Sequence, residues 1–419
     1  MLVSDSAIGT AKDNLTNPVH NWYRFTAGFS YKLINELLNQ VQITKGSKIY
    51  EPFSGCGTTL VQAQKLQVEA FGNEGQVFMR EIIEAKLNWS LNYEEVLKTV
   101  YKIEESISKR FDTYPEAAIH PLLKTLYTNE NLKYLYITKD FLQKKTHDKV
   151  YLFLKLALSQ TLHKCSIYPI SVPYISRANK LKGSYNSLVV FKETVNKMLG
   201  DLQELRNYKR TSQVFLHDSR KYNKNIETDL CDVCVTSPPY LNNLDYGEVS
   251  KVHTHFFGVT ESWNDITEKV RKNLVTAATT HYAGNDYNEQ EWKESEFCEI
   301  NKKVAQQLSH YSDSIRDSRI AKGGSKSFDI MLKFYFRDMF YVLKEMRRIL
   351  HGKGKAFIIL GDSAPYGVFV PTTDILGEIS LNLGFKKYEK HKIRTRGTKW
   401  QSLTHRHKLH LDENILVLR

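Results

Sequence analysis

The residues best suited to chemistry are Ser237, Pro238, Pro239 and Tyr240, which follow a short run of strand-forming residues at 232–235. Because prolines cannot donate ladder hydrogen bonds, the strand must end there in a stiff, extended turn. The turn places a hydroxyl, a backbone carbonyl and a phenol ring at the carboxyl end of a strand, where open α/β sheets bind ligands. Two such oxygens could accept from both N–H groups of a nucleobase amine and free its lone pair, while the ring holds the base by its face. The alternative is a purely structural turn with Tyr240 as a lid.

A second candidate site lies in KIYEPFSGCGTT (48–59), which predicts a strand, a glycine turn and the start of a helix. Gly55 and Gly57 let the backbone approach a ligand, and the helix directs its free N–H groups to the same place. The lysine of a phosphate-binding P-loop is missing. A second strand at 68–71 leads to Glu74, roughly 20 residues past the turn, where an acid can bind two ribose hydroxyls. This order of elements indicates a nucleoside-containing cofactor.

Taken together, EPFSGCGTT, the later GNE and TSPPY resemble the S-adenosylmethionine-dependent DNA amino-methyltransferases, which methylate cytosine N4 or adenine N6. The resemblance covers 15–90, 214–260 and 330–419. It implies that S-adenosylmethionine is held by Phe53, Ser54, Gly55, Gly57, Thr58, Glu74 and Asp218. It implies that Ser237 and the Pro238 carbonyl, followed by Pro239, act on the amine while Tyr240 stacks on the base, and that no metal is needed. The aromatic segment 21–25 resembles the family motif that helps close over the cofactor. Glu51 stands where the family more often has Asp, and we assign it no contact.

The remaining chain predicts the elements that position these two turns. Ser30 is a good N-cap for a helix at 31–40, 212–219 is the third strand, and 147–162 is a buried helix. A long amphipathic helix begins at 328 and stops at Gly352. A strand at 355–363, a helix at 370–385 and an antiparallel pair at 387–395 and 413–419 follow. Alternating strands and helices that end in a hairpin are typical of an α/β, Rossmann-like, seven-stranded methyltransferase sheet.

Two insertions divide this sheet in the sequence. Residues 1–90 form the cofactor-binding first part of the catalytic domain, 214–260 carry the SPPY motif, and 330–419 complete the domain with a basic C-terminal hairpin. Residues 91–213 form a helical insertion for target recognition; the alternative is a stabilising helical cap. Residues 261–329 form a second insertion, polar and charged, which we expect to be mobile and to contact DNA.

A net charge of +13 over 419 residues indicates an anionic partner, which the resemblance implies is double-stranded DNA. In the basic segment 386–410 we expect Arg394, Arg396 and Lys399 to contact phosphates near the target base; a solvated hairpin is the alternative. There is no apolar run of about 18 residues and no signal peptide is evident, so no membrane is expected. Five cysteines, an odd number, argue against a disulfide framework and for a reducing cytoplasm, in a bacterium or archaeon, with nucleoid association while bound to DNA.

The first residue of the SPPY turn predicts the product. In the family, adenine enzymes usually carry Asp or Asn there and cytosine N4 enzymes usually Ser, so Ser237 predicts N4-methylcytosine in a base flipped out of the duplex. A partner restriction endonuclease is possible. The alternatives are adenine N6, RNA in place of DNA, and a non-catalytic nucleic-acid-binding protein on a methyltransferase scaffold.

Overall fold

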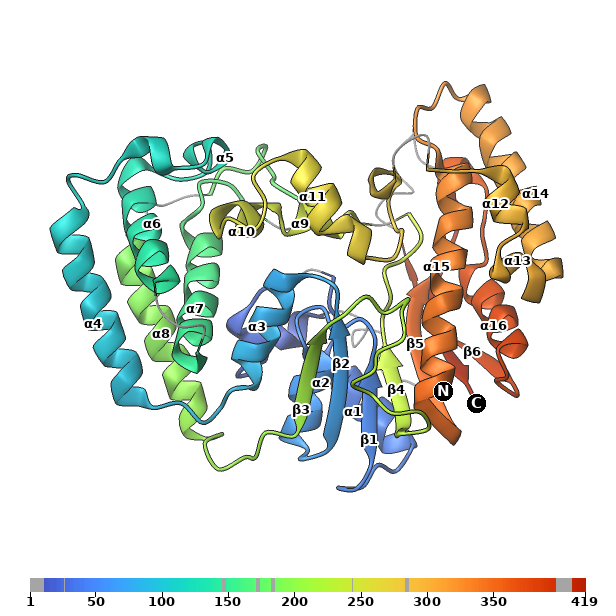
Figure 1. The fold of residues 1–419 in the computed structure, drawn as a ribbon, viewed down its shortest axis with the longest axis horizontal. Helices are drawn as coiled ribbons and strands as arrows, with labels where there is room; N and C mark the ends of the chain where they lie inside the picture. The colour runs from blue at the N-terminus through green and yellow to red at the C-terminus, as the bar shows by residue number, and fades with distance from the viewer. Residues whose placement is uncertain are drawn as a thin grey trace.

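The sheet at the centre of the molecule has seven strands. The computed structural model describes residues 11–25, 27–144, 148–170, 174–181, 185–242, 244–282, 286–396 and 409–419. The strands are β1 (Lys48–Glu51), β2 (Glu69–Glu74), β3 (Ser212–Leu216), β4 (Cys231–Thr236), β5 (Leu350–Gly361), β6 (Tyr388–Arg396) and β7 (Leu411–Leu418). Their order is β3-β2-β1-β4-β5-β7-β6, with helices on both faces (Figure 1). The predicted seven-stranded α/β fold is confirmed.

The register of the central strands creates the ligand edge. β1 lies between β2 and β4 and runs parallel to both, with Ile49 opposite Ala70 on one side and Val233 on the other. β4 is also parallel to β5, whereas β7 is antiparallel to β5 and β6, which confirms the predicted closing hairpin. The direction of strand succession reverses between β1 and β4, and in α/β sheets a crevice opens beyond the carboxyl ends at such a point.

Helices on the two faces bury alternate residues of the strands. The flanking elements are α1 (Tyr31–Gln40), α2 (Thr58–Lys65), α3 (Val77–Leu87), α15 (Phe328–Ile349) and α16 (Thr372–Asn382), with 3-10 turns η2 (Ala11–Leu15), η3 (His20–Trp22) and η7 (Pro365–Gly367). Because successive strand residues point to opposite faces, Ile49 joins the apolar cluster under α1 to α3 and Tyr50 the one under α15 and α16. Ser30 caps α1 by accepting from the Lys32 N–H, as predicted. Among the described residues, no helix is long and apolar enough to cross a membrane.

The end of α15 corrects one prediction. Gly352 does not stop the helix, which ends at Ile349; the glycine lies inside β5. Leu350 is buried and already pairs with Cys231 of β4. Sheet pairing therefore begins before the glycine, because a strand partner from a distant part of the chain outweighs the local stop signal.

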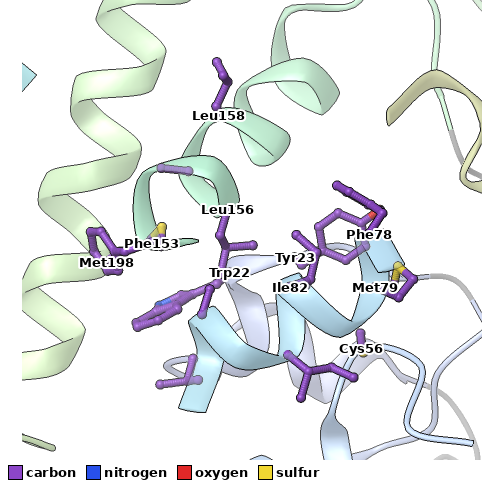
Figure 2. Close-up of a cluster of buried hydrophobic side chains, with 14 of the residues drawn as sticks. Trp22, Tyr23, Cys56, Phe78, Met79, Ile82, Phe153, Leu156, Leu158 and Met198 are labelled. Carbon is purple, nitrogen blue, oxygen red and sulfur yellow. The ribbon is translucent and has the colours of Figure 1, made fainter. Parts of the chain in front are cut away.

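The helical insertion shares its core with the cofactor-binding part. It contains α4 (Tyr93–Arg110), η4 (Glu116–Ala118), α5 (Pro121–Lys124), α6 (Asn129–Gln143), α7 (Lys149–Cys165) and α8 (Ser187–Gln203). Figure 2 shows Phe153 of α7 and Met198 of α8 against Trp22 of the N-terminal segment, with Ile82 of α3 beside them. Trp22 Nε1 donates to Asp201 Oδ2 at 2.8 Å. The insertion is thus fixed to the sheet rather than tethered by a linker.

The second insertion contains several helices. α9 (Tyr246–Val249) and α10 (Lys251–Phe256) precede it; its own elements are α11 (Trp263–Lys269), η5 (Arg271–Asn273), η6 (Thr279–His281), α12 (Glu289–Lys293), α13 (Glu296–Ile300) and α14 (Lys302–Ala321). Trp292, Phe297, Leu308 and Ile315 are buried in the same cluster as α15. The described residues of this insertion therefore form helices that pack on α15 through apolar side chains spaced among many charges, whereas its mobility and its contact with DNA stay predictions. In Figure 1 the helical insertion stands at one end and α12 to α14 at the other, with α9 to α11 above the sheet edge between them.

Candidate active site

A pocket of about 800 Å³, open mouth included, lies beyond the carboxyl ends of β1, β2 and β4. Its walls include Phe53 and Gly55 from the glycine turn, Glu74 from β2, Asp218 after β3 and Ser237 after β4. These residues are as far as 184 positions apart in sequence (237 − 53), and the sheet topology brings them together. Phe25 of the N-terminal aromatic segment and the nearby Phe29 also line the pocket.

The two glycines of the turn have different surroundings. Both have positive φ, +54° at Gly55 and +83° at Gly57, where a side chain is strained. Gly55 lines the pocket, and a Cβ there would lie 3.2 Å from Phe25 Cε1. Gly57 faces the helix layer, because its Cβ would lie 3.1 Å from Ile83 Cγ2 on α3. The structure thus places Gly55 against the cavity and gives Gly57 a packing role behind the turn; Ser54 and Thr58 line the cavity with Gly55.

Glu74 spans the two loops at the edge of the pocket. The Gly55 N–H donates to its Oε2 and the Gln76 N–H to its Oε1, each at 2.9 Å. A carboxylate has about four acceptor positions, so Glu74 keeps acceptor capacity beyond these two bonds. Burial raises the pKa of Glu74 to about 7, against the lowering effect of these N–H groups. The side chain is therefore poised between its neutral and charged forms at neutral pH.

Glu51 links the glycine turn to the SPPY turn. This carboxylate, 1% exposed at the end of β1, accepts from Thr59 Oγ1 at 2.8 Å, from the Phe53 N–H at 3.1 Å and from Thr236 Oγ1. Thr236 immediately precedes Ser237. Burial raises the pKa of Glu51 to about 8, although the hydroxyl and N–H donors oppose the shift. One side chain therefore sets the relative position of both turns.

The residues of the SPPY turn divide between two environments. Ser237 and Pro239 line the pocket, and Pro238 is buried. Tyr240 turns toward the C-terminal hairpin, where its hydroxyl donates to Glu413 Oε1 at 3.0 Å and the Arg396 guanidinium lies 5.0 Å from its ring centroid. Of the groups expected to act on an amine, Ser237 thus lies at the pocket wall, whereas Pro238 is buried behind it and Tyr240 is anchored outside the pocket.

The second insertion completes the pocket, which the sequence did not indicate. Asn273, Leu274 and Val275 line it. Asp338 of α15 fixes this segment by accepting from the Thr276 N–H at 3.0 Å and from Arg220 Nη1 at 3.1 Å. A segment assigned from sequence to DNA contact therefore forms a wall of this pocket.

Asp218 is held in place by the same arginine. Arg220 donates from Nε to Asp218 Oδ1 at 2.9 Å and from Nη2 to Oδ2 at 2.8 Å. Burial alone would raise the pKa of Asp218, but the hydrogen bonds and charge of Arg220 outweigh it and lower that pKa. Asp218 thus faces the cavity as a carboxylate whose orientation is set by a bidentate ion pair.

No protein-family model matches the chain. The chain is 23% identical to the type II methyltransferase M.BsoBI of Geobacillus stearothermophilus, over 91% of this chain and 82% of the relative. Its homologues are type II DNA methyltransferases. M.AvaI of Nostoc sp. is 22% identical over 89% of this chain and 80% of the relative, and M.MvaI of Kocuria varians is 20% identical over 92% and 85%. The family resemblance drawn from EPFSGCGTT and TSPPY is confirmed.

The basic hairpin that ends this methyltransferase-like chain is only partly described. Arg394 Nε donates to Glu413 Oε2 at 2.6 Å, and Arg396 packs on Tyr240. Lys399 lies outside the described residues, since 397–408 are not among them. The phosphate contacts expected of these three residues therefore stay a prediction, and the two arginines have protein partners beside the SPPY turn.

Three features of this methyltransferase-like site escaped sequence reasoning. Glu51 carried a signal, an acid at the end of a buried strand before the glycine turn, but no contact could be assigned to it. Arg220 and Asn273 carried none, because each reaches the pocket through contacts between segments far apart in sequence.

Proposed function

We propose that this protein is an S-adenosylmethionine-dependent DNA methyltransferase that methylates the N4 amino group of cytosine. The observation that carries the proposal is a single pocket whose walls include the glycine turn, Glu74 and Ser237. A cofactor site and an amine-activating turn that open into one cavity allow direct transfer between two bound molecules. The curated relatives, each called a type II methyltransferase, support the reaction class.

The pocket residues fit S-adenosylmethionine. Gly55 leaves its wall free of side-chain atoms, and Phe25 and Phe53 offer aromatic surface for an adenine ring. The Glu74 carboxylate retains acceptor capacity for two ribose hydroxyls. When bound, S-adenosylmethionine would supply an electrophilic methyl group on its sulfonium sulfur, which the amine nitrogen would take while the sulfur keeps the electron pair of the broken S–C bond and water takes the proton from nitrogen.

Ser237 and Pro238 would prepare the amine for this reaction. The serine hydroxyl and the proline carbonyl accept one N–H bond each, which favours a tetrahedral nitrogen whose lone pair is no longer shared with the ring. Such preorganised acceptors lower the barrier because they need no rearrangement as the nitrogen changes geometry. Glu51 and Thr236 keep this turn at a fixed distance from the cofactor turn.

The choice of cytosine N4 rests on the family correlation at Ser237. A hydroxyl is shorter than the Asp or Asn side chain usual in adenine enzymes, so the amine must lie closer to the end of β4. The target base has to leave the duplex to reach this pocket, which costs a few kcal/mol of stacking and pairing. We assign target recognition to 91–213, with help from 261–329, and bacterial or archaeal restriction–modification, with an endonuclease partner, is the setting that such relatives suggest.

Transfer of a labelled methyl group from S-adenosylmethionine to duplex DNA and to RNA tests the proposal. We expect label in DNA, and a loss of at least about 100-fold in kcat for Ser237→Ala with cofactor affinity unchanged. Ser47→Ala, at the opposite end of β1, is the matched control and should keep full activity. No label in either nucleic acid from a folded protein that binds S-adenosylmethionine would refute the assignment, and label in RNA alone would replace the substrate.

A further inference from the structure

The phenol of Tyr240 is fixed by a chain of contacts that ends on β6. Its hydroxyl donates to Oε1 of Glu413, which is 5% exposed on β7, and Glu413 Oε2 accepts from Arg394 Nε at 2.6 Å. The cross-strand pair depends on a register shift: Lys392 pairs with Asn414 but Arg394 with Glu413, so Ile393 is an extra residue in β6. Such a bulge re-aims side chains. Here it brings the guanidinium to the buried carboxylate that holds Tyr240.

The ring of Tyr240 is supported on one face as well. The Arg396 guanidinium lies 5.0 Å from the ring centroid, within the range of a cation–π contact. It fits there only because residue 361 is glycine, since a Cβ at Gly361 would overlap Arg396 Nη1. One ring face is therefore covered by protein, and only the other can receive a base.

The direction of these hydrogen bonds fixes the phenol. A phenol has one proton, and Tyr240 gives it to Glu413, whose second oxygen accepts from Arg394. The ring is therefore tied at its hydroxyl and supported on one face, three residues after Ser237. Glu413 and Arg394 thus hold the ring beside residues that line the pocket.

We propose that Glu413 and Arg394 are positioning residues for methyl transfer, which hold the ring of Tyr240 in place beside Ser237 for an incoming base. This rests on the proposed function. It gives Arg394 a different role from the phosphate contact expected from sequence. Removing Arg394 would leave a buried carboxylate without its cation, and removing the phenol hydroxyl would release the ring from that carboxylate.

Steady-state kinetics on DNA, measured for four variants, tests whether Glu413 affects methyl transfer through Tyr240. In Glu413→Gln an amide NH₂ replaces one oxygen, so Tyr240 or Arg394 loses its acceptor; in Tyr240→Phe the chain is cut without loss of ring volume. We expect kcat to fall about tenfold or more in both, with Kd for S-adenosylmethionine and KM for DNA within about twofold of wild type. Adding Glu413→Gln to Tyr240→Phe should cause no further loss, because both changes break one pathway. Lys392→Gln is the control and should leave kcat unchanged. Lys392 lies on β6, as Arg394 does, and the substitution removes one positive charge from its ion pair with Asp412 of β7.

The salt dependence of DNA binding tests the alternative role of Arg394, which is a contact with a DNA phosphate. For Arg394→Gln we expect lower kcat and an unchanged slope of log affinity against log salt. A slope reduced by about 1 with unchanged kcat would assign Arg394 to a phosphate and overturn the inference. Wild-type kcat in Tyr240→Phe would also overturn it, even if Glu413→Gln failed to fold. Both of these outcomes would be measured against an active wild-type protein. A wild-type protein that methylates no DNA is a different result, and it would refute the proposed function together with the inference.

Discussion

The protonation state of Glu74 should make cofactor binding depend on pH. Burial raises the pKa of this carboxyl to about 7 in the free protein, whereas ribose hydroxyls donate only to a group that accepts, so binding favours the ionised form. The sign follows from linkage: the folded, ligand-free protein holds its proton below pH 7, and the cofactor must displace it. Affinity is therefore full above about pH 8 and declines as the pH falls through 7.

The magnitude follows from the pKa. If only the ionised form binds, about half of the protein is competent at pH 7 and about one tenth at pH 6, so Kd should rise about tenfold between pH 8 and pH 6. Binding at pH 7 should release about half a proton from this group, and nearly none at pH 8.5. Calorimetry in two buffers with different ionisation enthalpies measures both quantities.

Glu74→Gln is the matched control, because it keeps the shape of the side chain without a titrating group. We expect weaker binding and a smaller pH dependence between pH 6 and 8. If wild type and Glu74→Gln showed the same pH dependence and the same proton release, Glu74 would not be the ribose acceptor, and the reasoning from its burial would be refuted.

Three further predictions follow from the positions of the turns and insertions. Gly55→Ala should raise the Kd for S-adenosylmethionine in a folded protein. Gly57→Ala should mainly lower the melting temperature, by the equivalent of about 1–2 kcal/mol, since it strains a positive φ and crowds Ile83. Thermal melting measures the loss of stability, and equal effects of the two variants on the Kd measured by calorimetry would disprove this prediction. Lys399→Ala should weaken binding to all DNA sequences alike and reduce the salt slope by about 1; an unchanged slope would favour a solvated hairpin. Exchange of 91–213 for the corresponding segment of a relative, with the packing of Phe153 and Met198 around Trp22 preserved, should move the methylated sequence. An unchanged site in an active hybrid would place recognition elsewhere.

Local chemistry determined what the sequence could predict. Prolines after a strand, glycines before a helix and Ser30 before an amphipathic run specify backbone geometry by themselves, so the turns, α1 and the strands other than β5 were predicted close to their observed bounds. The end of α15 was not, because β4 recruits Leu350 into the sheet before Gly352 can act as a stop.

The candidate site was predictable in its parts but not in its connections. The motifs placed Glu74 and Ser237 at strand ends, and the topology brings them into one pocket. Glu51, Arg220 and the hold of Glu413 on Tyr240 each join segments that are distant in sequence. Such contacts depend on register and burial, which no single stretch of sequence encodes.

Mass spectrometry of nucleosides tests the central claim most directly. Duplex DNA incubated with the protein and S-adenosylmethionine would be digested and compared with DNA treated with Ser237→Ala. We predict N4-methylcytosine in the wild-type sample and none in the variant. N6-methyladenine without N4-methylcytosine would contradict the product assigned to Ser237, and unmodified DNA across a full set of sequences would contradict the enzyme assignment itself.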